Sequence, residues 1–408
     1  MRIMLSFDPG LSMKFRLGLY VKTIAGALLM LVSVMTGVSM AETYPTERIF
    51  AISDEAAAGS SRKKIDLGET GFSFTTLLDD KMETWTDPGV NDKQGVIAKI
   101  YEPENRDKLM IEVHRLRFPS FAEAQVTGYG FLALNGYNRI IQDKAKGNTV
   151  FGYLAGSEFD DAKGYSRMAR AAVVTHGRDV LVVMAQFGYD DYPELEDTLA
   201  RFFGGIKMEE ASSAFESLAE KKTQHGEIFL YPRDWQLKKF DDTDRPAGSA
   251  DYSMAMEGNE YPNVLLLIRQ GSLEEARKVG TKMISEFTDQ VEKSGKASFA
   301  GDPTLETFKD ENGKVIAHSY ARGWDTPSGG PFVSEFYVQK NAAPSTTSIV
   351  GLNSLDVRRR IDTFDEETRQ ILFNGWVTGV SAYSVVKMSL TQDEEAISTE
   401  FDLRAVGR

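Results

Sequence analysis

The sequence predicts an α+β protein made of two tandem units, each an antiparallel sheet flanked by helices. A strand-like run ends at a tryptophan twice, at Trp85 and at Trp235. An S-x-x-E capping box, in which serine and glutamate side chains satisfy free backbone N–H groups at a helix start, follows each tryptophan. The boxes begin at Ser120 and Ser272, which lie 35 and 37 residues beyond the tryptophans. This repeated spacing indicates a duplicated architecture.

The first unit continues with strands on both sides of its first helix. An apolar run at 108–116 predicts a strand ahead of the capping box. Residues 170–187 read as two strands that meet at a turn around 176–179. A closing helix is predicted after a cap at 191–194, and its apolar stripe consists of Leu195, Leu199, Phe202, Phe203 and Ile206.

The second unit repeats this order of elements. The apolar run 263–270 precedes its capping box, and Asn312-Gly313 is the favoured two-residue turn of a β-hairpin. Further strands are predicted at 332–339 and 346–352, and the last helix is predicted to be capped at 363–366. The predicted divisions of the chain are a signal peptide at 1–41, an N-terminal segment at 42–66, a first domain at 67–208, a charged linker at 209–225, a second domain at 226–388 and a tail at 389–408.

The N-terminus has the pattern of a secretory signal peptide. Basic residues from Lys14 to Lys22 precede an apolar run over 24–38, and the small residues Ser39 and Ala41 follow it. The run is shorter than the roughly 20 apolar residues that span a bilayer, which argues against a membrane anchor in the mature form. The pattern predicts translation from Met13, a mature N-terminus at Glu42 and a periplasmic location, with an extracellular one as the alternative.

Composition and charge narrow the classes of partner and chemistry. The chain has no cysteine, which excludes disulfides, thiolate metal sites and a cysteine nucleophile. Its net charge is −13, from 47 basic and 60 acidic residues. Cleavage after Ala41 removes four basic residues and one acidic residue, which leaves −16. Nucleic acid and anionic lipid are therefore poor partners.

The segment Tyr231-Pro-Arg-Asp-Trp235, with its preceding strand and the elements that follow, resembles the PsbP-like superfamily, which includes DcrB-type bacterial envelope proteins. The first copy departs from this pattern because no proline precedes Trp85. The resemblance implies that each unit is an αβα sandwich and that the protein is a non-enzymatic accessory or assembly factor. It transfers no catalytic residue. We expect the tryptophans to plug sheet edges rather than to contact a ligand.

No catalytic motif stands out. The four histidines, at 114, 176, 225 and 318, are scattered and match no zinc motif, so structural roles are favoured. Gly128 to Ala133 matches a loose dinucleotide fingerprint, but it lies within the predicted helix, where small residues favour close packing. Acidic pairs recur along the chain, and the metal candidates are Asp241, Asp242 and Asp244. Solvated turns explain these pairs better, because the spacing of a calcium-binding loop is absent.

The stretch ARGWDTPSGGPF, residues 321–332, is the candidate partner-binding element. Its prolines and glycines predict a loop that displays Arg322, Trp324 and Asp325, and arginine and tryptophan are enriched in binding hot spots. The competing interpretation is that Trp324 packs back onto the sheet.

These observations favour a non-enzymatic periplasmic accessory or assembly protein that binds another protein or an envelope component such as the cell wall. The alternatives are a periplasmic small-molecule or cation-binding protein and a hydrolase of unrecognised type. No cofactor is predicted.

Overall fold

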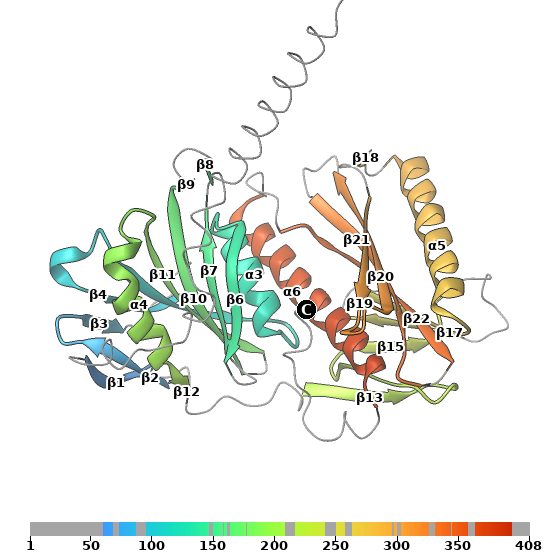
Figure 1. Cartoon of the computed structure of the whole chain (residues 1–408), viewed down its shortest axis with the longest axis horizontal. Helices are drawn as coiled ribbons and strands as arrows, with labels where there is room; N and C mark the ends of the chain where they lie inside the picture. The colour runs from blue at the N-terminus through green and yellow to red at the C-terminus, as the bar shows by residue number, and fades with distance from the viewer. Residues whose placement is uncertain are drawn as a thin grey trace, which may run out of the picture.

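The computed structural model describes residues 60–67, 73–86, 95–146, 150–157, 159–160, 164–176, 178–208, 217–240, 250–257, 263–295, 298–299, 303–325, 331–343, 345–357 and 364–393. Within these ranges two large antiparallel sheets stand side by side with helices between and outside them (Figure 1). The predicted leader 1–41, the candidates Asp241, Asp242 and Asp244, and the predicted cap Thr363 lie outside the described residues.

The two sheets share one strand order. The first contains, in spatial order, β3 (Glu83–Thr86), β4 (Val96–Tyr101), β5 (Met110–Arg117), β11 (Asp179–Gly188), β10 (Arg167–His176), β7 (Val150–Gly156) and β6 (Arg139–Lys146). The second contains β15 (Gln236–Lys239), β16 (Tyr252–Ala255), β17 (Val264–Gln270), β22 (Thr346–Leu355), β21 (Pro331–Lys340) and β20 (Val315–Asp325), and both β18 (Ser298–Phe299) and β19 (Thr304–Lys309) pair with β20. The predicted α+β class, with two helix-flanked antiparallel sheets, is confirmed.

Short strands extend each half. A small sheet joins β1 (Ser60–Asp66), β2 (Ser73–Asp79) and β12 (Lys207–Met208), while β13 (Leu218–Lys222) pairs with β14 (Ile228–Pro232), and β8 (Phe159–Asp160) pairs with β9 (Gly164–Tyr165). A 3-10 turn, η4, covers Pro103–Asn105. Strand β1 lies in the N-terminal segment predicted at 42–66, and β13 lies in the linker predicted at 209–225.

Four α-helices in the described part of the chain cover the sheets. They are α3 (Ala124–Leu134), α4 (Tyr192–Gly205), α5 (Leu273–Ser294) and α6 (Glu366–Thr391). Figure 1 shows α4 and α5 on the outer sides of the two sheets, and α3 and α6 between the sheets. The central strand β11 is buried continuously from Val180 to Ala185, as expected for a strand covered on both faces.

Helix α6 serves both halves of the molecule. Toward the first sheet, Phe373, Trp376 and Val377 join a core cluster with residues of β10, β11 and α3. Toward the second sheet, Tyr383 and Val386 pack in a cluster with Phe229, Trp235 and Tyr252. From Trp376 to Leu390 nearly every residue of α6 is buried, as expected for a helix that lies in an interior. The two halves therefore share part of their core through α6.

The glycines of α3 bring this helix close to its neighbours. A Cβ at Gly130 would lie 2.3 Å from Trp376 of α6, and one at Gly128 would lie 2.3 Å from Tyr153 of β7. Such distances are far below van der Waals contact. The packing interpretation of this glycine pair is confirmed.

The predicted helix caps are confirmed only in part. Ser272 and Glu275 form the complete capping box at the start of α5. In contrast, α3 begins after Glu123 with no side-chain cap, and Ser120 contacts the other half of the molecule instead. The start of α6 is capped by Asp365, whose side chain accepts a hydrogen bond from the Thr368 N–H.

Ser120 links the two halves through the tryptophan motif of the second. Its Oγ donates to Asp234 Oδ1 at 2.6 Å and accepts from Trp235 Nε1 at 2.8 Å. Trp235 is 5% exposed, so the expected buried role is confirmed for this copy. Trp85, on the edge strand β3, is 41% exposed, so the expectation that it plugs the sheet edge is wrong.

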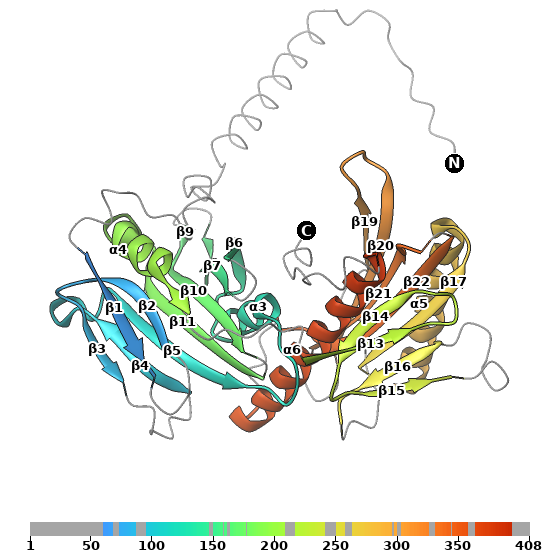
Figure 2. The same ribbon diagram turned by 90° about the horizontal axis from the view of Figure 1, so that it is seen from below.

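The hairpin predicted at Asn312-Gly313 exists with a longer turn. The N–H of Asp310 donates to the Lys314 carbonyl at 2.9 Å, which leaves three residues in the loop. Gly313 has a φ of 77°, the left-handed conformation that closes a three-residue hairpin loop. Figure 2 shows that the β19–β20 hairpin projects beyond the rest of its sheet.

Candidate functional site

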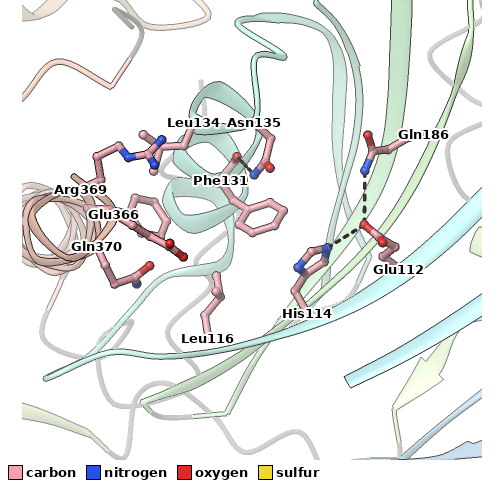
Figure 3. Close-up of a pocket in the computed structure, with 11 residues that line it drawn as sticks. Glu112, His114, Leu116, Phe131, Leu134, Asn135, Gln186, Glu366, Arg369 and Gln370 are labelled. Atoms are coloured by element: carbon pink, nitrogen blue, oxygen red, sulfur yellow. Dashed lines mark hydrogen bonds and ion pairs between the residues drawn. The ribbon is translucent and has the colours of Figure 1, made fainter. Parts of the chain in front are cut away.

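A cavity of about 410 Å³ opens between the first sheet, α3 and the start of α6 (Figure 3). Strands β5 and β11 provide one wall, the second half of α3 another, and the first two turns of α6 the third. It therefore lies where the two halves meet. Its lining residues are Glu112, His114, Leu116, Phe131, Leu134, Asn135, Gln186, Glu366, Arg369, Gln370 and Phe373.

Glu112 carries the negative charge on the cavity wall that the sheet forms. One of its oxygens lies 3.1 Å from Lys99 Nζ, and the other lies 3.5 Å from His114 Nε2 and accepts from Gln186 Nε2 at 3.4 Å. The hydrogen bond from His114 and that from Lys99 outweigh desolvation and lower the pKa of Glu112 to about 2. Glu112 is therefore a fixed carboxylate at neutral pH.

His114 is held from both sides. Its ring contacts Glu112 and lies against Phe131 of α3, with ring centroids 4.9 Å apart at 64°. The imidazole is 5% exposed although it reaches the cavity. This packing fixes the ring orientation and agrees with the structural role that the sequence favoured.

Gln186 connects the wall to a wider polar network. Its Oε1 accepts from Arg167 at 2.7 Å and from the Tyr137 hydroxyl at 3.0 Å, while its Nε2 donates to Glu112. Because each side-chain atom of Gln186 has a partner, the amide orientation is fixed. The sheet wall is thus a pre-organised polar surface.

The α6 wall supplies groups with unused hydrogen-bonding capacity. Arg369 Nε is buried and has no hydrogen-bond partner within the described part of the chain. Glu366, Arg369 and the exposed Gln370 lie on the side of α6 that faces the cavity (Figure 3). An arginine with a free donor beside a cavity can bind a carboxylate or a backbone carbonyl of a ligand.

The lining groups of this cavity can form hydrogen bonds and ion pairs with a ligand. The described lining residues include no serine, threonine, lysine or tyrosine next to His114 that could serve as a nucleophile. No group of three or more histidine or acidic residues able to hold a metal occurs among the residues that the structure describes. The lining includes guanidinium and amide groups and two phenylalanine rings.

The sequence-predicted recognition element lies elsewhere and differs from its prediction. Strand β20 ends at Asp325 and strand β21 begins at Pro331. Within this stretch, residues 326–330 fall outside the described strands. Trp324 is 3% exposed, donates its Nε1–H to Ser334 Oγ at 3.0 Å and meets the Phe287 ring edge to face at 6.1 Å. The predicted loop is corrected at Trp324, because the strand continues and turns the indole inward. The alternative interpretation, that Trp324 packs back onto the sheet, is the one observed.

The flanking residues of that element are more accessible. Arg322 is half-buried and Asp325 is exposed. The guanidinium of Arg322 lies 6.0 Å from the Trp324 ring centroid. The structure therefore does not bring the three candidates together as one exposed patch.

One pattern in the sequence could have indicated the cavity residues. Glu112 and His114 alternate with Ile111 and Val113, so they must share one face of the strand. Two polar residues on an inward face indicate a polar site, but nothing local links them to α6, more than 250 residues away in the chain.

Comparison with known proteins gives distant structural likenesses. No family model and no curated protein sequence matches the chain. The solution structure of cyanobacterial PsbP from Synechocystis sp. PCC 6803 is similar over 36% of this chain and 93% of its own, with 14% identity and a TM-score of 0.29. The Saccharomyces cerevisiae Ran-binding protein Mog1p is similar over 36% of this chain and 95% of its own, with 11% identity and a TM-score of 0.24. These likenesses are weak, and the architecture described above rests on strand order and helix placement.

Among the described residues, no helix is both long and apolar enough to cross a bilayer.

Proposed function

We propose that this chain is a non-enzymatic accessory or assembly protein, exported through its N-terminal leader, that binds a segment of an envelope protein in the cavity between β5, α3 and α6. The observation that carries the proposal is the cavity itself, which joins a pre-organised polar wall to the free donor of Arg369. Pockets of this volume suit a short peptide segment or side chain.

The lining chemistry favours a peptide over an apolar ligand. Amide groups of Asn135 and Gln370 and the guanidinium of Arg369 can pair with backbone carbonyls or a carboxylate, and Phe131 and Phe373 can contact apolar side chains. Glu112 adds a fixed negative charge to the opposite wall. A segment that carries both polar and apolar groups meets all of these walls.

The domain organisation belongs to the same proposal. We propose two PsbP-like units at 67–208 and 226–388, derived from one duplicated ancestor, with a mature N-terminus at Glu42. The equivalent strand orders of the two sheets support this proposal. The placement of the cavity at the junction means that both units contribute to one site.

Site-specific photo-crosslinking tests the binding site. A photo-reactive residue at Gln370, on the cavity rim, is expected to capture one discrete envelope protein, and excess unlabelled protein should compete for it. The matched control is the same residue at Lys282 on α5, whose side chain is 74% exposed and remote from the cavity.

The Arg369→Gln substitution sharpens the test. Loss of a charge-assisted hydrogen bond is expected to weaken capture at position 370 by about tenfold or more. Equal capture at positions 370 and 282, or capture that excess protein fails to reduce, would contradict a binding site in this cavity.

A further inference from the structure

A second cavity, of about 190 Å³, lies at the far end of α6 and takes no part in the proposed function. The turn between β13 and β14, the segment after β21 and the C-terminal end of α6 enclose it. Its polar lining comes from Glu227, Gln392 and Asp393, and Ala342, Ala343 and Leu390 contribute backbone and apolar surface. Near the C-terminal end of α6, the Ser389 hydroxyl accepts a hydrogen bond from the Leu230 N–H of β14 at 2.9 Å.

Glu227 carries an uncompensated buried carboxylate oxygen. The residue is 4% exposed, and one of its oxygens accepts a hydrogen bond from the Thr223 hydroxyl. The other oxygen, Oε1, is buried and has no hydrogen-bond partner in the ranges that the structure describes. Burial of an unpaired carboxylate is strongly unfavourable, so such an oxygen calls for a partner such as a bound ion.

The end of α6 adds a second, independent source of negative potential. Aligned peptide dipoles give a helix C-terminus a partial negative charge, which lysine, arginine or histidine in the last turn often neutralises. The last turn of α6 contains no basic residue. Of its terminal carbonyls, Leu390 accepts from the Ala342 N–H at 2.9 Å and Ser389 from the Gln392 N–H at 3.4 Å. A carbonyl oxygen has two lone pairs, so both retain capacity to coordinate a cation.

We propose that this cavity binds one hard divalent cation, Ca²⁺ in preference to Mg²⁺. Glu227 and Asp393 supply the negative charge, and the Gln392 side chain, backbone carbonyls and water supply neutral oxygens. Two carboxylates with carbonyls and water form an irregular oxygen set of the kind that Ca²⁺ accepts, whereas Mg²⁺ requires near-octahedral geometry. A cavity of this size holds the ion with several waters, since each water occupies about 30 Å³.

Calorimetric titration of the chelator-treated full chain with CaCl₂ tests the site. We expect one ion bound per chain and a melting temperature that rises with calcium by mass action. MgCl₂ should bind more weakly and shift the melting temperature less. Absence of calcium binding, or an equal response to both ions, would overturn the proposal.

Substitutions of the two carboxylates locate the ion. Glu227→Gln keeps the side-chain shape but removes the charge, so we expect it to abolish the calcium-dependent shift without lowering the melting temperature of the calcium-free protein. Asp393→Asn changes an exposed residue and should weaken calcium binding by about tenfold or more. Glu311→Gln, in the exposed β19–β20 turn, is the control and should bind calcium like the unmodified chain. Unchanged calcium binding in both carboxylate variants would place the ion elsewhere and overturn the assignment.

Discussion

Trp376→Ala is expected to lower the free energy of unfolding of the whole chain by about 3–5 kcal/mol, the cost of removing a large aromatic side chain from a core. Trp376 is 9% exposed on α6, stacks with Phe373 at 6.4 Å and fills the space left by Gly130 of α3. The indole therefore holds an element of the second half against an element of the first. Denaturant unfolding monitored by circular dichroism measures the change.

Ile371→Ala is the matched control for this effect. Ile371 lies on the same helix but is 63% exposed, so its truncation should change stability by no more than about 0.5 kcal/mol. Because alanine is the better helix former, a comparable loss in both variants would mean that truncation at any position of α6, and not burial between the sheets, explains the effect of Trp376→Ala.

Glu123→Gln is expected to stabilise the protein at neutral and alkaline pH. Glu123 precedes α3 and is 3% exposed, and desolvation raises its pKa to about 7 despite a favourable charge on Lys387. Its backbone N–H donates to Ser381 Oγ of α6 at 3.0 Å, so the backbone of Glu123 is held where the two halves meet. One of its carboxylate oxygens has no hydrogen-bond partner among the described residues.

The sign of the pH dependence follows from the direction of this shift. Because the folded-state pKa exceeds the unfolded value of 4.5, the folded state binds the proton more tightly. The associated stability is fully present below pH 4.5 and is lost as the pH rises through about 7. The loss is on the order of 3 kcal/mol at 1.36 kcal/mol for each pKa unit.

Denaturant unfolding at several pH values tests this prediction. The stability difference between Glu123→Gln and the unmodified chain should be near zero at about pH 4 and grow in favour of the variant toward about pH 8. A variant that is less stable than the unmodified chain at the higher pH would show that Glu123 is an ionised partner of Lys387.

The fold was predictable wherever local sequence rules determine structure. The capping box at Ser272 and the paired strands on both sides of 176–179 appear as expected, because backbone hydrogen bonds and turn geometry depend on neighbouring residues. The same S-x-x-E pattern at Ser120 predicted a capping box that does not form at the start of α3. There, Asp234 and Trp235, more than 110 residues away, bind the serine hydroxyl and displace the local cap.

The candidate site was less predictable because tertiary contacts create it. Its walls come from β5, β11, α3 and α6, and only the alternation at Glu112 and His114 was visible locally. The prediction that residues 321–332 form a loop displaying Trp324 was wrong for a related reason. Apart from Gly323, the glycines and prolines of this segment follow Asp325, so β20 continues through Trp324 and the indole is buried.

Differential scanning calorimetry of residues 60–393 tests most directly the central claim that α6 joins both sheets into one folding unit. A shared core predicts a single transition whose calorimetric and van't Hoff enthalpies agree. Trp376→Ala should move that transition to lower temperature without splitting it. Two separate transitions in the unmodified chain, with only one of them shifted by Trp376→Ala, would contradict the claim.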